Sequence, residues 1–347
     1  MSSHPPDPAS LRHVAELAGV SVATASRVMS GSSHPVSDRT REKVLSAADR
    51  LSFEPNRLAR ALVTARSQTI GVIVHDISDP YFGEIVKGLE DGVHAQDYRL
   101  FVASSDRDPD KELNYVRAFH AHQVDAIVFA ASSMVDPVYV ASLETMASRF
   151  QSRGGVMVAL SDHVLDVPRV RFDNRAAVTA MVGHLAEHGH RNIGFIGGPT
   201  DLEVSRVRLS GFNASVAELG LAGGPEFVVD GGFTITGGEA AMAQLLERVP
   251  VTAVLAASDL MAIGATRHLL AAGLSVPGEV SVAGLDDIPL AAYGPVPLTT
   301  LRIPTYEIGR RGAELLLAAL DGEQLDDVVV SGEIVVRDSV GPVRKPI

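Results

Sequence analysis

The sequence predicts an α/β protein in which a small three-helix head precedes a larger body built on parallel sheets. Three short segments with helical periodicity fill residues 11–51. From residue 68 onward, eight apolar runs of strand length alternate with helix-like segments, as in parallel α/β sheets. The chain has 347 residues, too many for one ordinary core, so we expect two or three domains.

The head has the pattern of a helix-turn-helix unit with a third, supporting helix. The expected helices are 11–18 after the N-cap Ser10, 22–29 after Ser21, and 38–51 after Ser37. Gly19 ends the first helix because glycine tolerates a positive φ. The expected core consists of Leu11, Val14, Val20, Val28 and Leu51, with Val44, Leu45, Ala48 and Leu51 turned inward from the third helix. Taken alone, this spacing also fits an ordinary helical hairpin.

Each expected strand of the body ends in Asp, Ser or Gly. The runs are TIGVIVHDI, YRLFVASSD, DAIVFAAS, GGVMVALSD, RNIGFIGG, EFVVDGG, TAVLAASD and VSVAGLDD. In open parallel sheets, ligands bind beyond the carboxyl ends of the strands, where these polar residues lie. Eight strands over this length favour two similar lobes rather than one sheet.

The charge is distributed unevenly along the chain. Residues 1–66 contain 9 Lys and Arg against 6 Asp and Glu, a net charge of +3, whereas the remainder carries −15. A basic head on an acidic body would orient the molecule toward phosphates. The absence of cysteine fits a reducing cytoplasm, and we find neither a secretory signal nor an apolar run of about 18 residues. We therefore expect a cytoplasmic protein, associated with the nucleoid.

Motifs for catalysis or for a cofactor are missing. The glycine-rich stretches GFIGGP and DGGFTITGG match neither GxxxxGK[ST] nor a strand-linked GxGxxG, and there is no nucleophile elbow. His184 and His188 share a helix face near His190, but no HExxH pattern completes a metal site. We expect no enzyme activity, no cofactor and no metal.

The strings VAELAGVSVATASRVMSG and VSDRTREKVLSAADRLSFEPNRLARAL resemble the lac repressor (LacI/GalR) family. Farther along, HDISDPYFGEIVKGLE, VRFDNRAAV, GHRNIGFIGGP, SRVRLSGF, AASDLMAIGA and GLDDIPLAAY resemble its effector domain, which is similar to periplasmic sugar-binding proteins. The resemblance implies a tail (1–9), a DNA-binding domain (10–54), a hinge helix and linker (55–67), and an effector-binding and dimerisation domain (68–347). Its N-lobe would comprise 68–163 and 293–327, and its C-lobe 164–292 and 328–347, with crossings near 164, 292 and 328.

The resemblance also implies contacts with DNA. Base edges would meet Val22, Ala23 and Arg27, phosphates would meet Ser21, Thr24, Ser26, Asn56 and Arg57, and Leu62 would wedge into a minor-groove step. Arg27 could donate two hydrogen bonds to guanine. Val22 and Ala23 depart from the polar pairs common in the family and can only touch a thymine methyl. The alternative is that both pack in the core.

A small molecule would bind between the lobes. The implied effector residues are Asp79, Tyr81, Phe82, Asp162, His163, Arg208, Phe233, Ser258 and Asp286. Carboxylates, one arginine and aromatic faces suit a neutral polyhydroxy ligand, whereas an anion would need more uncompensated Arg or Lys. His163, Ser258 and Ile303 depart from the family's usual Arg, Asn and Gln. The alternatives are that Asp79 only starts a helix, Tyr81 packs on the hinge, Arg208 pairs with Asp286, and Asp259 and Asp287 cap helices.

These features predict a homodimeric, ligand-responsive transcription regulator. We expect a repressor that binds a near-palindromic operator and is released by a neutral sugar or polyol. In one alternative, a sugar, nucleobase or nucleoside raises operator affinity instead, as a co-repressor. In another, the body belongs to a periplasmic-type solute-binding protein, which should begin with a signal sequence and lack the head.

Overall fold

The computed structural model describes residues 10–29, 35–53, 66–323 and 326–343 of the chain. It divides the protein into two compact units, Met1–Gln68 and Thr69–Ile347, here called the head and the body. The expected residues Asn56, Arg57 and Leu62 lie outside the described ranges. Among the helices that are described, none is long and apolar enough to cross a membrane.

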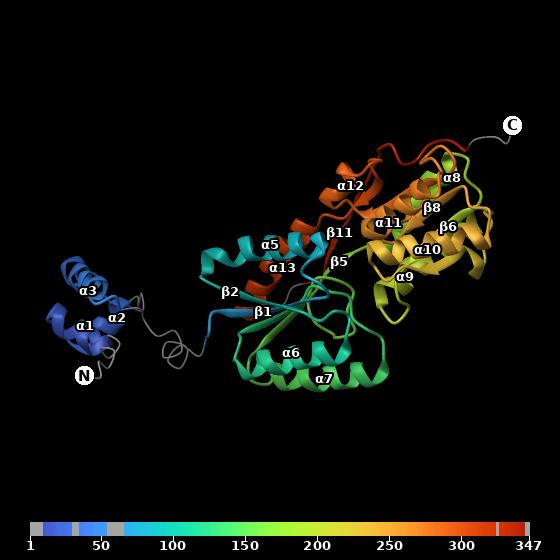
Figure 1. Cartoon of the computed structure of the whole chain (residues 1–347). Coiled ribbons are helices and arrows are strands. Elements are labelled where there is room, and N and C mark those ends of the chain that lie inside the picture. Colours follow the sequence, from blue (N-terminus) through green and yellow to red (C-terminus); the bar gives the residue numbers. More distant parts are fainter. Residues whose placement is uncertain (1–9, 30–34, 54–65, 324–325, 344–347) are drawn as a thin grey trace, which may run out of the picture. The chain divides into compact units, whose positions relative to one another are not determined.

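The head contains the three expected helices, α1 (Leu11–Ala18), α2 (Val22–Met29) and α3 (Asp38–Arg50) (Figure 1). The Ser10 hydroxyl accepts a hydrogen bond from the His13 amide at 3.4 Å, and Gly19 ends α1 with φ 67°. The buried core is Val14, Ala15, Ala18, Ala25, Val28, Val44, Ala47 and Ala48, with Leu11, Val20 and Leu51 partly buried around it.

The predicted core of the head is wrong at one position. Leu45 is 49% exposed, and Ala47 is buried in its place. Successive residues of a helix are separated by about 100°, so positions 44, 47 and 48 share a face that excludes position 45.

The smaller sheet of the body is parallel throughout and has the order β2-β1-β3-β4. Its strands are β1 (Thr69–Val74), β2 (Arg99–Ser104), β3 (Ala126–Phe129) and β4 (Val156–Ala159). The helices α5 (Pro80–Val93) and α13 (Thr305–Leu320) cover one face, and α6 (Pro109–Ala121) and α7 (Pro137–Gln151) cover the other (Figure 1). A short 3-10 helix, His94–Gln96, follows α5.

The larger sheet has the order β12-β10-β9-β8-β6-β7, parallel except for β12. Its strands are β6 (Ile193–Gly197), β7 (Val228–Asp230), β8 (Ala253–Ala256), β9 (Ser281–Asp286), β10 (Thr299–Arg302) and β12 (Glu333–Val335). Its helices are α8 (Asn174–Glu187), α9 (Glu203–Glu218), α10 (Ile235–Arg248), α11 (Asp259–Ala271) and α12 (Pro289–Tyr293), with a 3-10 turn at Pro225–Phe227. All eight expected runs form strands, and the body has two lobes.

Two further strands, β5 (Val170–Phe172) and β11 (Val328–Val330), pair with each other where the chain passes between the lobes. The expected crossing near residue 292 is wrong, because β10 pairs with β9 and the chain leaves the larger sheet only after Arg302. The run TTLR gave no apolar signal, yet Thr299 and Thr300 are fully buried with their hydroxyls hydrogen bonded.

Each lobe contains one helix pair in backbone contact through glycines. A Cβ on Gly309 of α13 would lie 2.0 Å from the Ile85 carbonyl of α5, and one on Gly264 of α11 would lie 2.0 Å from the Ile235 carbonyl of α10. This packing fixes α5 and α11 against their sheets. The N-terminal ends of both helices border the cavity described next.

Candidate ligand cavity and nucleic-acid surface

The second helix of the head turns a distinct face to solvent. Val22 is 47% exposed, and Ala23 and Arg27 are exposed as well, whereas Ala25 and Val28 are buried. The core-packing alternative for Val22 and Ala23 is therefore wrong. The exposed face can meet the floor of a DNA groove.

The flanking hydroxyls of α2 already serve the helix end. The Ser21 hydroxyl accepts from the Thr24 amide at 3.1 Å and lies 2.8 Å from the Thr24 hydroxyl. Ser21 is therefore the N-cap that the sequence predicts. Ser21 and Ser26 are exposed and Thr24 is half-buried, so the first two are more accessible to a phosphate.

A cavity lies between the lobes, beyond the carboxyl ends of strands from both sheets. Its lining residues are His75, Asp79, Tyr81, Phe82, Arg107, Ala130, Ser132, Leu160, Ser161, Asp162, Phe172, Asn174, Leu202, Val204, Arg208, Phe233, Ser258 and Asp286. Eight of the nine expected residues are among them. The lobes also touch directly at its border, where the Val204 amide donates to the Ser132 hydroxyl at 3.0 Å.

His163 is the expected residue that does not line this cavity. Its ring packs on Phe129 with centroids 4.5 Å apart, and its Nδ1 accepts from the Leu165 amide at 3.2 Å. Burial, with a smaller contribution from Arg169, lowers the pKa of His163 to about 3. The side chain therefore fills the core behind the strand end as a neutral ring.

At the C-lobe end of the cavity, Arg208 is held entirely by the protein. Its Nε donates to the Asn174 side chain at 2.8 Å, its Nη1 donates to the Ala257 carbonyl, and its Nη2 lies 3.9 Å from the Asp286 carboxylate. The expected alternative of an Arg208–Asp286 pair is therefore confirmed. Burial raises the pKa of Asp286, although Arg208 opposes the shift.

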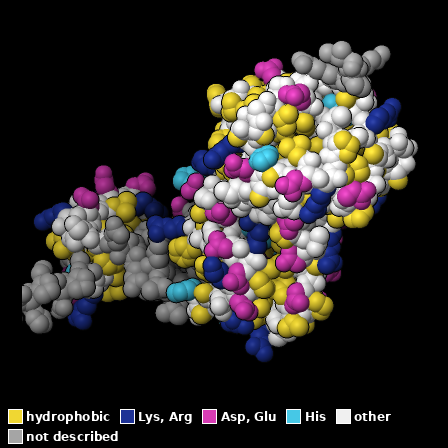
Figure 2. Space-filling model, turned by 45° about the vertical axis from the view of Figure 1, so that its right-hand side comes forward, with side chains coloured by type: hydrophobic (Ala, Val, Ile, Leu, Met, Phe, Trp, Pro, Cys, Tyr) yellow, Lys and Arg dark blue, Asp and Glu magenta, His cyan; other side chains and the backbone are white. Residues whose placement is uncertain are grey.

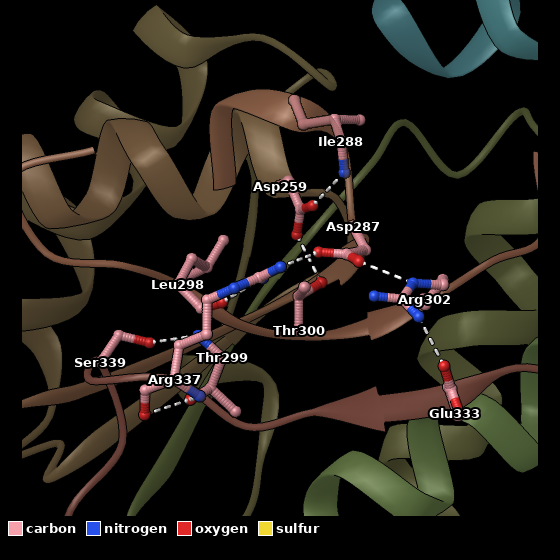
Figure 3. Close-up of polar contacts among 10 residues, drawn as sticks. All are labelled: Asp259, Asp287, Ile288, Leu298, Thr299, Thr300, Arg302, Glu333, Arg337 and Ser339. Carbon is pink, nitrogen blue, oxygen red and sulfur yellow. Dashed lines mark hydrogen bonds and ion pairs between the residues drawn. The ribbon is translucent and has the colours of Figure 1, made fainter. Parts of the chain in front are cut away.

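Asp259 and Asp287 are not part of the cavity lining, and Figure 3 shows the contacts of their carboxylates. Asp259 accepts from the Thr300 hydroxyl at 2.6 Å and from the Ile288 amide at 2.9 Å. Asp287 binds Arg302 at 2.8 Å and Arg337 at 2.7 Å. The expectation that both cap helices is wrong. Asp259 ties α11 to β10 and to the segment after β9, and Asp287 ties the end of β9 to Arg302 and Arg337.

The N-lobe end of the cavity is formed partly by the start of α5. The Asp79 carboxylate accepts from the Tyr81 amide at 3.0 Å, so it caps α5 and lines the cavity at once. Burial raises the pKa of Asp79. Tyr81 and Phe82 meet edge to face with centroids 5.1 Å apart, which gives this end an aromatic wall. On the same side, Asp162 is paired with Arg171 of β5 at 2.7 Å.

Five polar lining residues were missed by the sequence analysis: His75, Arg107, Ser132, Ser161 and Asn174. His75 directly follows β1, and Arg107 follows β2 by three residues. The rule that ligands bind beyond strand ends could have found both residues. Asn174 opens α8, directly after the first crossing strand, where no ligand signal is visible in the sequence.

Comparisons with known proteins agree with this geometry. Residues 10–56 match the model described as "Bacterial regulatory proteins, lacI family", and residues 182–340 match "Periplasmic binding protein-like domain". The repressor CytR of Escherichia coli K12 is 33% identical over 336 residues, covering 95% of this chain and 96% of CytR. The regulator GalR of the same strain is 34% identical over 335 residues, covering 96% of each chain.

Solved structures are similar over nearly the whole chain. The lac repressor dimer bound to operator and the anti-inducer ONPF is 26% identical with a TM-score of 0.83, covering 96% of this chain and 99% of that one. A complex of the transcriptional regulator CelR with cellobiose is 31% identical with a TM-score of 0.69, covering 96% of this chain and 100% of that one.

Proposed function

The chain belongs to the lacI family of bacterial regulatory proteins and is a ligand-responsive, DNA-binding transcription regulator rather than an enzyme; from this premise we propose that it represses transcription as a homodimer and is released from its operator by a neutral sugar or polyol. The exposed face of α2 in the head and the mixed-charge cavity of the body support the two halves of this proposal. The match over residues 10–56 favours it over a transport-type solute-binding protein.

On the DNA side, α2 enters the major groove. Arg27 reads a guanine, and Val22 and Ala23 touch thymine methyl groups, since neither can form a side-chain hydrogen bond. Ser21 and Ser26 contact phosphates. The net charge of +3 over residues 1–66 adds a salt-dependent attraction.

On the ligand side, the observation that carries the proposal is the charge balance of the cavity. Arg208 is paired with Asp286, and Asp162 with Arg171 outside the lining. Burial raises the pKa of Asp79 and of Asp286, although the Tyr81 amide and Arg107 oppose the shift at Asp79 and Arg208 opposes it at Asp286. A cavity that holds its charges in this way suits a ligand without net charge, whose hydroxyls fill the remaining hydrogen bonds.

The second copy of the chain covers the outer edge of β2 in this proposal. This strand lies at the edge of its sheet and exposes Phe101 (50%) and Val102 (40%). An open apolar edge strand is a surface that proteins normally cover. Acidic and basic side chains are interspersed over the face of the body that Figure 2 shows.

The test is an operator-binding titration of the full chain. Promoter fragments from the neighbourhood of its own gene are titrated at low and at moderate salt, with and without D-ribose, D-glucose, cellobiose and uridine. We expect tight binding that weakens steeply with salt and is released by one of these neutral compounds. Tighter binding with the compound would show the co-repressor sign instead, and release only by phosphorylated or carboxylated compounds would contradict the neutral-effector proposal.

A further inference from the structure

Three histidines lie at the C-terminal end of α8, and the protein uses them differently. His190 is buried, with its Nδ1 3.0 Å from the Thr252 hydroxyl and its Nε2 3.0 Å from the Gly341 carbonyl. Both of its ring nitrogens are therefore occupied, and they tie the C-terminal segment to the start of β8. The other two, His184 and His188, are half-buried and keep ring nitrogens that no described residue uses.

His184 and His188 lie side by side, one helical turn apart. Their ring centroids are 4.6 Å apart, and the ring planes are inclined at 56°. Residues four positions apart share a helix face, so the backbone of α8 holds both imidazoles in one small volume. Imidazole nitrogens bind a zinc ion at about 2.0–2.1 Å, so two rings can share one ion only when they lie this close.

The hydrogen bond of His188 determines which of its nitrogens is free. Its Nδ1 lies 2.8 Å from the His184 carbonyl, and a carbonyl can only accept, so Nδ1 carries the proton. In the neutral ring, Nε2 then has the free lone pair. An N–H group bonded to a backbone carbonyl orients metal-binding histidines in the same way.

The Nε2 atom of His184 is buried and has no hydrogen-bond partner among the described residues. Burial, with a smaller contribution from the charge of His188, lowers the pKa of His184, although Glu187 opposes the shift. The ring is therefore neutral at pH 7, and the neutral imidazole is the form that binds a metal ion. A buried nitrogen without a partner is costly, and a bound ion would satisfy it.

The surroundings of the pair favour a cation and leave coordination positions open. The charge of Glu187 acts on His184 and attracts a positive ion. In the part of the chain that the structure describes, no group of three His, Cys, Asp or Glu side chains could hold a metal ion, so water would complete the coordination of an ion at this pair. Imidazole suits Zn²⁺, Ni²⁺ and Cu²⁺, whereas Mg²⁺ prefers oxygen ligands.

We propose that His184 and His188 form a two-histidine binding site for a divalent transition-metal ion, Zn²⁺, Ni²⁺ or Cu²⁺, at the C-terminal end of α8. The Nε2 atoms of both rings bind the ion. The ion links the last turn of α8 to His188, whose carbonyl accepts from the Val343 amide at 3.0 Å, so it also stabilises the C-terminal segment. Neither histidine lines the cavity between the lobes, so the site does not depend on the proposed effector.

The test is calorimetric melting of the full-length protein with ZnCl₂, NiCl₂ or CuCl₂, and with MgCl₂ as the negative probe. The variants are His184→Gln and His188→Gln. The matched control is His122→Gln, because His122 is the exposed C-cap of α6 as His188 is the C-cap of α8. Melting curves without metal verify that each variant folds. The transition of the body reports only ions that bind the folded body.

At a metal concentration about tenfold above Kd, we expect the body transition of the wild type and of His122→Gln to rise by about 2–5 °C. In His184→Gln and His188→Gln it should rise by less than about 1 °C, since one imidazole alone binds weakly. Cu²⁺ should act at the lowest concentration. The effect should disappear at about pH 5, where protons compete for the ring nitrogens.

Two results would overturn the proposal. One is the absence of any rise in the wild type with all three transition-metal ions. The other is an equal rise in the wild type and His188→Gln, or an equal rise with MgCl₂, which would place the effect outside this pair. If His184→Gln does not fold without metal, His188→Gln decides, because it removes one of the two ligands and leaves the buried part of His184 in place.

Discussion

The head and the cavity present their recognition groups in opposite ways. In the head, the groups that we propose to face DNA lie on or next to one exposed helix and within a few residues of each other, from Ser21 to Arg27. In the cavity, the lining comes from both lobes, and several of its polar groups, such as Arg208 and Asp286, are buried. A surface of the first kind depends on local folding, whereas a cavity of the second kind depends on the packing of the entire body.

This difference makes the two regions separable by mutation. A substitution in the head should change DNA affinity or the stability of the head and leave ligand affinity unaltered. A substitution in the cavity should change ligand affinity and the stability of the body together, because the same buried contacts serve both.

Arg208→Leu should produce the largest change. It leaves the Asp286 carboxyl and the Asn174 amide without their donor, and breaking one side of a buried pair costs about 3–5 kcal/mol. We expect the calorimetric transition of the body to shift down and effector affinity to fall by about 100-fold or more. The matched control is Arg206→Leu, an exposed residue of the same helix, which should cost less than about 0.5 kcal/mol. A head transition that fell with that of the body would contradict the separation.

The same contrast explains what could be predicted from the sequence. The helices of the head are set by residues inside or beside them, such as Ser10, Gly19 and Ser21, so periodicity and capping were enough. The strands of the body were visible as apolar runs. The threonines of β10 were not, because a hydroxyl buried with its partner is indistinguishable in sequence from an exposed one.

The cavity was only partly predictable, because its members meet through the fold. Resemblance supplied all nine expected residues, and eight of them line the cavity. The ninth, His163, points into the core against Phe129, and the sequence gives no sign of that direction. Arg107 and His75 carry no motif. Each has a buried nitrogen without a hydrogen-bond partner, which only three-dimensional contacts reveal.

Glu112→Gln should change how the stability of the body depends on pH. Burial raises the pKa of Glu112 to about 7 from 4.5, although the Tyr139 hydroxyl, which donates to it at 2.5 Å, opposes the shift. The folded carboxyl therefore binds its proton more tightly than the unfolded one, so its contribution to stability is lost as pH rises from about 4.5 to 7. A difference of 2.5 units corresponds to about 3 kcal/mol.

The measurement is urea unfolding of the wild type and Glu112→Gln at several pH values between about 5 and 8. The wild type should lose about 2–3 kcal/mol relative to the variant across this range. The neutral His75 and His163 contribute a slope of the opposite sign, lost as pH falls, but it is common to both proteins and cancels. Parallel profiles for the two proteins would show that Glu112 is ionised in the fold.

Arg27→Ala should weaken operator binding by about 5–150-fold, the equivalent of about 1–3 kcal/mol for one two-hydrogen-bond base contact. Its side chain is exposed, so the stability of the head should change little. Gel-shift titration measures the effect, with Lys43→Ala on the exposed face of α3 as the control. Effector affinity, measured by calorimetry, should be the same in all three proteins. If Arg27→Ala and the wild type bind the operator equally tightly, Arg27 does not contact the operator bases.

Ser10→Ala should produce the smallest change, confined to the head. Its hydroxyl accepts from the His13 amide, and its own amide donates to the His13 ring at 3.3 Å, so both ends of a capping box depend on these two residues. Losing such a cap costs about 1 kcal/mol, or about 4–8 °C in the melting temperature of a small domain. Ser46→Ala, in the middle of α3, is the control and should leave the head as stable or slightly more so, because alanine favours a helix interior. A body transition that moved with Ser10→Ala would mean that the head does not fold as an independent unit, and the DNA-binding surface would then depend on the same packing as the cavity.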